Sequence, residues 1–424
     1  MSTAVAAVKR FGVNRLRTPS VVSALLLLLV LLSSSLTPAY NWDLLAYSAI
    51  ALDEGDAVVR HERLWYYVDR DIPADAVARL RGESPDLLLG ERGDDTVAYR
   101  RTTALDARAF DEQLPFYAVK PMYPAMIAGL VAVTDSLVGT VVRDFDLGPV
   151  RASVWIAKIG WVFLGTALFW LLRLRFGDLL AFVGTLTMMT LPLVQALHGY
   201  SSPDTISALM VLLGFVLALR DPSRTWTMAS AGVVFLAVAV RPDNLLLLGV
   251  FLTWFLWNSR IRFRWAVMVG TTGLIWCLAL SELSGNYGWS VLVHHSFIDY
   301  LEYPSTVEPN LSLPLLVDIY LSKVSDSPTF FKFLGAGLLL TGWRLYLRGP
   351  SDRLFEALIV LLVFMAEHWL LFPDQKDRLL VAPYLFILSA GLFCLADQLA
   401  GIARIRKIAQ NELTNTHGKI KRHI

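Results

Sequence analysis

The chain has 424 residues, of which 55% are hydrophobic and 17% are charged, and its mean hydropathy is +0.52. Soluble domains carry about 25% charged residues, so this composition excludes a soluble globular protein, which needs a polar surface. The formal net charge is only +2 and the basic residues are scattered along loops, so we expect no nucleic-acid partner.

The chain begins with a basic segment at 1–19, which is followed by an apolar run at 20–37. This pair superficially resembles a secretory signal. The apolar stretch continues through Leu36, however, which favours an uncleaved signal anchor over a cleaved signal peptide. In either case, we expect the segment that follows to be translocated across the membrane.

Further apolar runs follow along the chain, and the side on which their arginine-rich loops fall decides the topology. The runs lie near 121–142, 150–172, 179–197, 204–219, 226–240, 243–257, 265–281, 329–347, 354–372 and 379–397. If every run crosses, the short arginine-containing loops face outward, against the strong preference of arginine for the cytoplasmic side. If 121–142 instead lies along the interface or dips part-way, those loops become cytoplasmic. This run opens with Pro121 and Pro124 and contains Asp135, which supports the second arrangement.

We therefore predict an all-α polytopic membrane protein with about ten transmembrane helices and both termini cytoplasmic. Its parts are a cytoplasmic N-terminal segment at 1–19, a transmembrane domain at 20–397 and a cytoplasmic tail at 398–424. The transmembrane domain includes a long extracytoplasmic loop at 38–149. This loop mixes charged residues with aromatic and apolar ones, a pattern typical of amphipathic helices on a membrane surface.

Two ionisable residues stand at the two ends of the first loop. Asp43 follows the first span and is flanked by aromatic residues, so it is a candidate general base or cation ligand. Its alternative role is to cap the helix that begins at Leu44. Lys120 precedes Pro121 at the interface, where it can pair with a lipid phosphate or simply anchor the chain at the headgroups.

Two more candidates lie in short outer turns. Asp204 follows Pro203 and either caps the next helix or converges with Asp43 on one site. Arg241 is the only arginine of an otherwise apolar hairpin and faces outward against the charge rule. It therefore needs a partner, which is either Asp243 or a phosphate.

The last candidates lie near the C-terminal spans. Glu367 and His368 fall within an apolar run, where ionisable residues are functional suspects. Arg378 stands at the outer mouth of the last helix, well placed to bind an anion. Other residues with ligating side chains lack metal or disulfide spacing and are expected to be solvated loop residues or small core residues: His294, His295, Asp299, Cys277 and Cys394.

Taken together, these segments resemble the GT-C superfamily of membrane glycosyltransferases, and more closely bacterial relatives of the protein O-mannosyltransferases and of the aminoarabinose lipid A transferase. The segment 42–51 resembles the acidic signature after the first helix, and 120–124 resembles a Lys-Pro-Pro-Leu-Tyr stretch, with Met122 at the second proline. Asp204 resembles the second acidic position, and 378–384 is similar to an Arg-Tyr-Leu-Leu-Pro-type segment. The motif-bearing match covers roughly 38–205. Where many members have a second acid, Leu44 follows Asp43, a departure from a two-carboxylate metal site.

The resemblance implies an enzyme that moves a hexosyl or pentosyl group from a polyprenyl-phosphate donor to an extracytoplasmic glycan, lipid or protein. It implies Asp43 as the catalytic base, Asp204 in acceptor or metal binding, and Lys120, Arg378 and Arg241 as phosphate-binding residues. The implied location is a bacterial inner (plasma) membrane with the site on the extracytoplasmic side. The resemblance implies no definite cofactor, and it leaves open whether the enzyme uses a divalent cation.

Other functions remain alternatives at this stage. A polysaccharide polymerase or ligase that acts on lipid-linked oligosaccharide shares the outer-face site. A lipid or solute transporter without chemistry predicts broken helices and ionisable residues at the bilayer midplane, a pattern that only Glu367 and His368 favour. A purely structural membrane protein gives no reason for Asp43, Lys120 and Asp204 to share one face.

Overall fold

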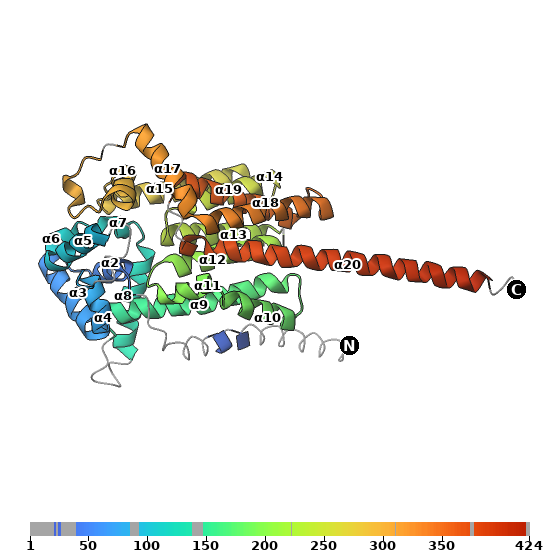
Figure 1. Ribbon diagram of the computed structural model, residues 1–424, viewed down its shortest axis with the longest axis horizontal. Helices are drawn as coiled ribbons and strands as arrows, with labels where there is room; N and C mark the ends of the chain where they lie inside the picture. Colours follow the sequence, from blue (N-terminus) through green and yellow to red (C-terminus); the bar gives the residue numbers. More distant parts are fainter. Residues whose placement is uncertain are drawn as a thin grey trace.

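The computed structural model describes residues 21–22, 24–26, 40–84, 93–137, 147–221, 223–309, 311–373 and 377–420. Regular structure within these ranges is helical throughout, without a strand. Figure 1 shows a helical bundle whose long helices run along the longest axis, with shorter helices gathered at one end. The fold class predicted from the sequence is therefore confirmed at this level.

The bundle is built from the part of the chain that begins with α9. Its elements are α9 (Pro149–Arg173), α10 (Asp178–Met189), α11 (Pro192–Gly199), α12 (Asp204–Arg220), α13 (Arg224–Val240), α14 (Asn244–Trp257), α15 (Phe263–Leu283), α18 (Pro328–Arg348), α19 (Arg353–Leu371) and α20 (Val381–Ile420). Helix α12 lies at the centre, because it packs against α9, α13, α19 and α20.

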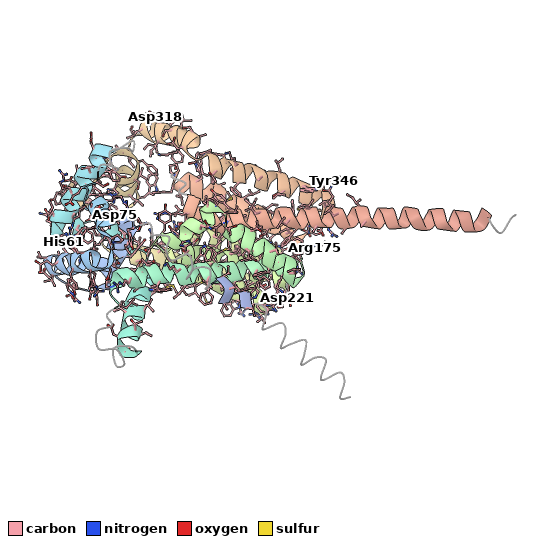
Figure 2. The ribbon with its side chains drawn as sticks, turned by 60° about the horizontal axis from the view of Figure 1, so that its bottom comes forward. His61, Asp75, Arg175, Asp221, Asp318 and Tyr346 are labelled. Atoms are coloured by element: carbon pink, nitrogen blue, oxygen red, sulfur yellow. The ribbon has the colours of Figure 1, made fainter. Side chains whose placement is uncertain are left out.

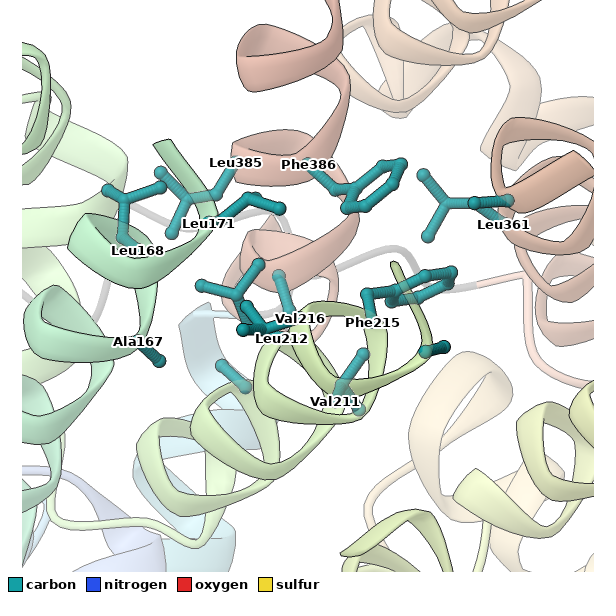
Figure 3. Packing of buried hydrophobic residues seen from close by; sticks show 14 of the residues in the cluster. Ala167, Leu168, Leu171, Val211, Leu212, Phe215, Val216, Leu361, Leu385 and Phe386 are labelled. Carbon is teal, nitrogen blue, oxygen red and sulfur yellow. The ribbon is translucent and has the colours of Figure 1, made fainter. Parts of the chain in front are cut away.

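The core around α12 is apolar and closely packed. In Figure 3, its side chains Leu212 and Phe215 belong to one cluster with side chains of α9, such as Leu168, and of α20, such as Phe386. The ring centroids of Phe215 and Phe386 are 4.6 Å apart. Aromatic pairs at this distance add to the apolar burial that holds helices together.

Close helix crossings depend on glycine. A Cβ atom on Gly214 of α12 would lie 2.6 Å from Cγ2 of Val234 on α13. The Ser230 hydroxyl of α13 donates a hydrogen bond of 2.7 Å to the Gly214 carbonyl oxygen. Small residues and hydroxyl hydrogen bonds of this kind join helices in an apolar environment, where lipid replaces water as the solvent.

Among the described residues, four helices are long and apolar enough to cross a membrane: Pro149–Arg173, Phe263–Leu283, Arg353–Leu371 and Arg378–Ala403. The number rises to six if each of two bent helix pairs forms one span. Within the most apolar window, 72% of residues are buried in α9 but only 11% in α15, so α15 lies at the periphery with apolar side chains facing outward. The protein is thus polytopic in character, as the sequence predicts.

The run at 121–142 is represented by α8 (Met122–Leu137), which differs in direction from the bundle helices. It makes an angle of 106° with the segment Ala107–Ala118 that precedes it. Both ribbon views show α8 running crosswise to α9. This is the direction that the sequence prediction of an interfacial helix requires.

The first loop forms a second, smaller unit with its own core. Its helices are α2 (Trp42–Ala51), α3 (Ala57–Asp71), α4 (Ala74–Leu80), α5 (Gly93–Leu105), α6 (Ala107–Asp111) and α7 (Pro115–Ala118). Helix α3 buries Leu64, Trp65 and Val68 on one face, the pattern expected of an amphipathic helix. The buried side chains of α2 to α6 form one apolar cluster.

A later segment closes over this unit from the C-terminal half of the chain. It contains α16 (Trp289–Val293), η3 (His294–Ile298) and η4 (Pro304–Thr306), and is followed by α17 (Leu313–Asp326). The Gln113 side chain donates to the carbonyl oxygens of Leu301 (3.0 Å) and Glu302 (2.9 Å). His295 stacks on Phe116 and accepts a hydrogen bond from the Leu301 amide, so the prediction that it is a solvated loop residue is wrong.

Candidate functional site

Asp43 lies in the first turn of α2, at the junction between the first loop and the bundle. Helix α2 is capped by Asn41, whose side chain accepts a hydrogen bond from the Leu44 amide (3.2 Å). The capping role considered for Asp43 therefore belongs to Asn41. The Asp43 carboxylate is left free for tertiary contacts, and its side chain keeps 18% of its surface exposed.

Arg378 joins the two acidic residues predicted from the sequence. It lies in the short helix η5 (Asp377–Leu380), directly before α20. Its guanidinium lies 2.8 Å from Asp43 Oδ2 and 3.2 Å from Asp204 Oδ2, and it lies 5.2 Å from the centre of the Tyr200 ring. The guanidinium thus lies within ion-pair distance of both carboxylates.

Asp204 is nearly fully buried at the start of α12, with 5% of its side chain exposed. Its carboxylate accepts hydrogen bonds from Arg241 (2.6 Å) and from the Ser202 hydroxyl (2.8 Å). It makes no capping hydrogen bond to its own helix, so the alternative role considered for it is wrong. A buried carboxylate requires such partners, because desolvation alone would make its charge unfavourable.

Arg241 extends the network toward the centre of the bundle. Besides Asp204, it pairs with Asp243 at 2.8 Å. Asp243 is one of the two partners that the sequence predicts for Arg241. His368 Nε2 lies 2.9 Å from Asp243 Oδ2. Burial would raise the pKa of Asp243, but the Arg241 charge and the His368 hydrogen bond outweigh burial and lower it.

Of the two ionisable residues predicted within a span, only one joins this network. His368 is buried on α19 and reaches Asp243, whereas Glu367 is partly exposed and takes no part in these contacts. The bond that His368 makes with Asp243 was not expected from the sequence. The sequence marks His368 as a functional candidate because it is an ionisable side chain in an apolar run, but this pattern gives no information on the residue that His368 contacts.

Lys120 lies beside the network without a carboxylate partner among the described residues. Its ammonium is 5.9 Å from the ring centre of Tyr47 and 5.8 Å from that of Tyr117. Burial and the neighbouring Arg241 lower the pKa of Lys120, while Asp43, Asp204 and Asp243 act in the opposite direction. Because no described carboxylate pairs with it, the Lys120 ammonium is available to bind an added anion.

The aromatic residues around Lys120 form a rigid wall. The Tyr47 ring lies 5.4 Å from that of Tyr117 and 5.1 Å from that of Tyr123, both edge-on. The Tyr123 hydroxyl donates to the Ser153 carbonyl oxygen at 3.1 Å, which ties α8 to α9. The sequence signal for Tyr47 was its place one helical turn after Asp43, which puts both residues on one face of α2.

Trp42 precedes Asp43 in the sequence, but its ring lies in a hydrophobic core and not beside the Asp43 carboxylate. It is buried and packs against Tyr99 and Phe110, with ring centroids 5.5 Å and 5.9 Å away. The ring therefore belongs to the core of the first-loop unit. Tyr200, by contrast, contacts the charged network, because its ring centre lies 5.2 Å from the Arg378 guanidinium.

The donor set of the site is better suited to ion pairing than to metal binding. In the part of the chain that the structure describes, no group of three or more His, Cys, Asp and Glu side chains has an arrangement suited to a metal ion. Both oxygens of Asp204 face arginines instead. Cys277 and Cys394 are free thiols within α15 and α20.

The five residues predicted from the sequence therefore come together at one end of the bundle. Asp43, Arg378, Asp204 and Arg241 form a continuous chain of ion pairs, and Lys120 flanks it. Comparisons of the chain with family models, curated proteins and solved structures found no match.

Proposed function

We propose that the protein is a membrane glycosyltransferase that moves a sugar from a polyprenyl-phosphate donor to an acceptor outside the membrane. The observation that carries this proposal is the Arg378 bridge between Asp43 and Asp204, with the ammonium of Lys120 close by. Transfer from a lipid phosphate needs a base for the acceptor hydroxyl and cations for the departing phosphate. The site has both kinds of group.

Asp43 is the proposed base. It takes the proton of the acceptor hydroxyl while the oxygen attacks the anomeric carbon. The bond between that carbon and the phosphate oxygen breaks, and its electron pair leaves with the polyprenyl phosphate. In the structure, Arg378 pairs with Asp43. A donor phosphate would draw the guanidinium toward itself and leave the Asp43 carboxylate free to accept the proton.

Lys120, Arg378 and Arg241 are the proposed phosphate-binding residues, with distinct tasks. Lys120 forms no ion pair with a described carboxylate, so it can bind the phosphate without breaking an existing ion pair and would bind it first. Arg241 is held by Asp204 and Asp243. We assign it to the electrostatic support of Arg378 through Asp204, which in turn would orient the acceptor. No step in this scheme requires a metal ion.

The proposed topology has about ten transmembrane helices, with the site on the extracytoplasmic side. Figure 2 supports it, since His61 and Asp75 of the first loop lie at one end of the bundle, and Arg175 and Tyr346 lie toward the opposite end, beyond which α20 extends. Helices α12, α13, α14 and α18 would be spans in addition to those recognised by length and composition. The proposed location is a bacterial inner membrane.

A transporter is the second candidate, because α10 and α11 together form a broken helix with a bend of 70°. Broken helices are typical of transporter binding sites. An enzyme and a transporter differ in product: only an enzyme yields a glycosylated acceptor and free polyprenyl phosphate. A polymerase or ligase would yield a lengthened glycan instead of a single added sugar.

The substitution Asp43→Asn tests the proposal, since it keeps the size of the side chain and removes the base. We expect glycosyl transfer to fall by about 100-fold or more, the usual contribution of a general base. Asp53→Asn is the matched control, because Asp53 is exposed on the same loop and its positive φ of 52° suits asparagine. The readout is the cell-surface glycan profile of strains that carry only the substituted form.

Two outcomes would contradict the proposal. If the Asp43→Asn strain has wild-type glycans, Asp43 is not the base. If Asp43→Asn abolishes the flux of a lipid or solute but leaves every glycan unchanged, the protein is a transporter. Equal amounts of folded protein, measured by detergent extraction and gel filtration, must accompany each comparison.

A further inference from the structure

A second positively charged site lies at the other end of the bundle from the Asp43–Arg378 pair. A cavity of about 480 Å³ opens there between the turn that precedes α13 and the turn that joins α14 to α15. Its lining is short and strongly basic: Arg224, Asn258, Ser259, Arg260, Ile261 and Arg262. The mechanism proposed above makes no use of this cavity.

The turn between α14 and α15 is held in place by its own hydrogen bonds. Ser259 adopts a left-handed φ of 53°, and the Arg260 amide donates to the Phe255 carbonyl oxygen at 2.8 Å. The Arg260 side chain reaches the Ala218 carbonyl oxygen at 3.5 Å, which connects the turn to the end of α12. The wall of the cavity is therefore preformed.

The charge of the cavity is only partly balanced by the residues that the structure describes. Glu356 of α19 lies 3.7 Å from Arg260 and also accepts a hydrogen bond from Asn258 (3.2 Å). Arg224 and Arg262 form no ion pair with a described carboxylate, and both are exposed. They stand at the beginnings of α13 and α15, where the helix dipoles add to the positive potential.

Two aromatic side chains next to the cavity indicate which anion fits it. Trp257 is 88% exposed and Phe263 is 72% exposed, directly before and after the lining segment 258–262. Aromatic residues of this kind mark the boundary between lipid and water. An anion at this depth is best supplied by a lipid headgroup, with its acyl chains beside the outward-facing α15.

We propose that this cavity binds the phosphate of an anionic phospholipid. The basic loops place this end on the cytoplasmic side in the proposed topology, and basic pockets between helices on that side suit anionic headgroups. Arg224 and Arg262 contact the phosphate, and Arg260 holds the turn against α12 and α19. The bound lipid joins the beginnings of α13 and α15, two helices that also pack directly against each other.

Lipid retention by the full-length protein, measured by native mass spectrometry, tests this site. The purified protein is loaded with an equal mixture of phosphatidylglycerol and phosphatidylcholine. We expect the wild type to retain phosphatidylglycerol, and Arg224→Gln with Arg262→Gln to weaken that preference by about 25-fold, or about fivefold for each arginine. Arg264→Gln is the matched control, since Arg264 is exposed on the same helix but does not line the cavity.

Two further measurements test whether loss of lipid reflects misfolding and whether the cavity binds free phosphate instead of a lipid. The double substitution to lysine keeps the charge and should retain most of the preference, which excludes misfolding as the cause of the loss. Equal retention of phosphatidylglycerol by wild type and the glutamine variant would overturn the proposal. So would release of the lipid by soluble glycerol phosphate at matched concentration, because it would show a site for a free phosphate. Glycosyl transfer is not the readout, so the outcome is independent of the active-site proposal.

Discussion

At the scale of single residues, Arg241 is the most constrained charge of the site. Its side chain is 9% exposed and lies between Asp204, which is 5% exposed, and Asp243, which is 30% exposed. A buried ion pair adds little net stability by its presence, but removal of one partner leaves the other charge buried without compensation. The effect of a substitution here therefore depends on which charges remain.

Arg241→Met is expected to destabilise the protein by about 3–5 kcal/mol, because it removes the counter-charge that Asp204 and Asp243 share. Thermal unfolding in detergent measures this change. Asp204→Asn combined with Arg241→Met should recover part of the loss, since one of the two carboxylates that lost Arg241 is then uncharged. A single variant as stable as Arg264→Met, an exposed control, would contradict the importance of this network.

Acid should weaken the same network in a defined direction. The pKa of Asp243 is lower in the folded protein than its ordinary value of 3.8. Its stabilising contribution is therefore fully present above that value and is lost as the pH falls from about 4 toward the folded-state pKa. We expect the difference in unfolding temperature between wild type and Asp243→Asn to shrink over that range. A difference that stays constant from neutral pH down to pH 3 would contradict it.

Much of the site could be predicted from residue types and their positions at the ends of apolar runs. Four site residues were recognisable in this way, because ionisable residues next to apolar spans are rare and usually pair with another charge or serve a function. They are Asp43, Asp204, Arg241 and Arg378. Their pairing was not predictable, since Arg378 meets Asp43 across most of the chain. The roles of Asn41 and His368 were also beyond the sequence, because both depend on which neighbour packing brings close.

At the scale of elements, the contact between α12 and α13 fixes the distance between Asp204 and Arg241. Asp204 begins α12 and Arg241 follows the end of α13, so the two charges lie at the same end of an antiparallel helix pair. Gly214 permits the close approach of the two helices near their middle. The geometry of the charged network therefore depends on a residue that carries no charge.

Gly214→Ala is expected to cost about 1–3 kcal/mol, because the new methyl group would overlap Val234. The comparison is Gly249→Ala on α14, which has open space around its Cβ position and should be neutral or slightly stabilising. Unfolding temperatures of the two variants in the same detergent give the measurement. Equal stability would mean that α12 and α13 adjust freely.

Helix α8 shows what sequence patterns can establish about an element and what they cannot. Pro121, Pro124 and Asp135 predict a helix that does not cross, which stays a prediction; α8 lies crosswise to α9. The contact between Tyr123 and Ser153 that holds it there was not visible, because it joins residues from two apolar stretches. Periodicity indicates a buried face but not its partner.

At the scale of the whole molecule, the two ends of the bundle differ in charge chemistry. One end has the network of Asp43, Arg378, Asp204 and Arg241 next to the first-loop unit. At the other end, Arg175, Arg344 and Arg348 pair with Asp397, whereas Arg224 and Arg262 of the cavity form no ion pair with a described carboxylate. The number of spans was less accessible, since α13 and α14 are short apolar helices whose composition alone does not decide whether they cross.

Cysteine labelling from outside the cell tests the proposed orientation. In a background without Cys277 and Cys394, a cysteine at the exposed Asp53 should react with a membrane-impermeant maleimide, and one at the exposed Asp221 should react only after permeabilisation. Asp53 lies in the first loop and Asp221 in the turn before α13. The reverse pattern, or labelling of both positions in intact cells, would refute the topology.

The alternating ion pairs from Asp43 to His368 also have a consequence for biosynthesis. The acids of this network are made first, at positions 43, 204 and 243, whereas Arg378 is made later. Until the segment before α20 is inserted, Asp43 and Asp204 share a membrane boundary without their common counter-charge. Ribosome-bound chains that end before Arg378 should therefore be substrates for membrane quality-control proteases.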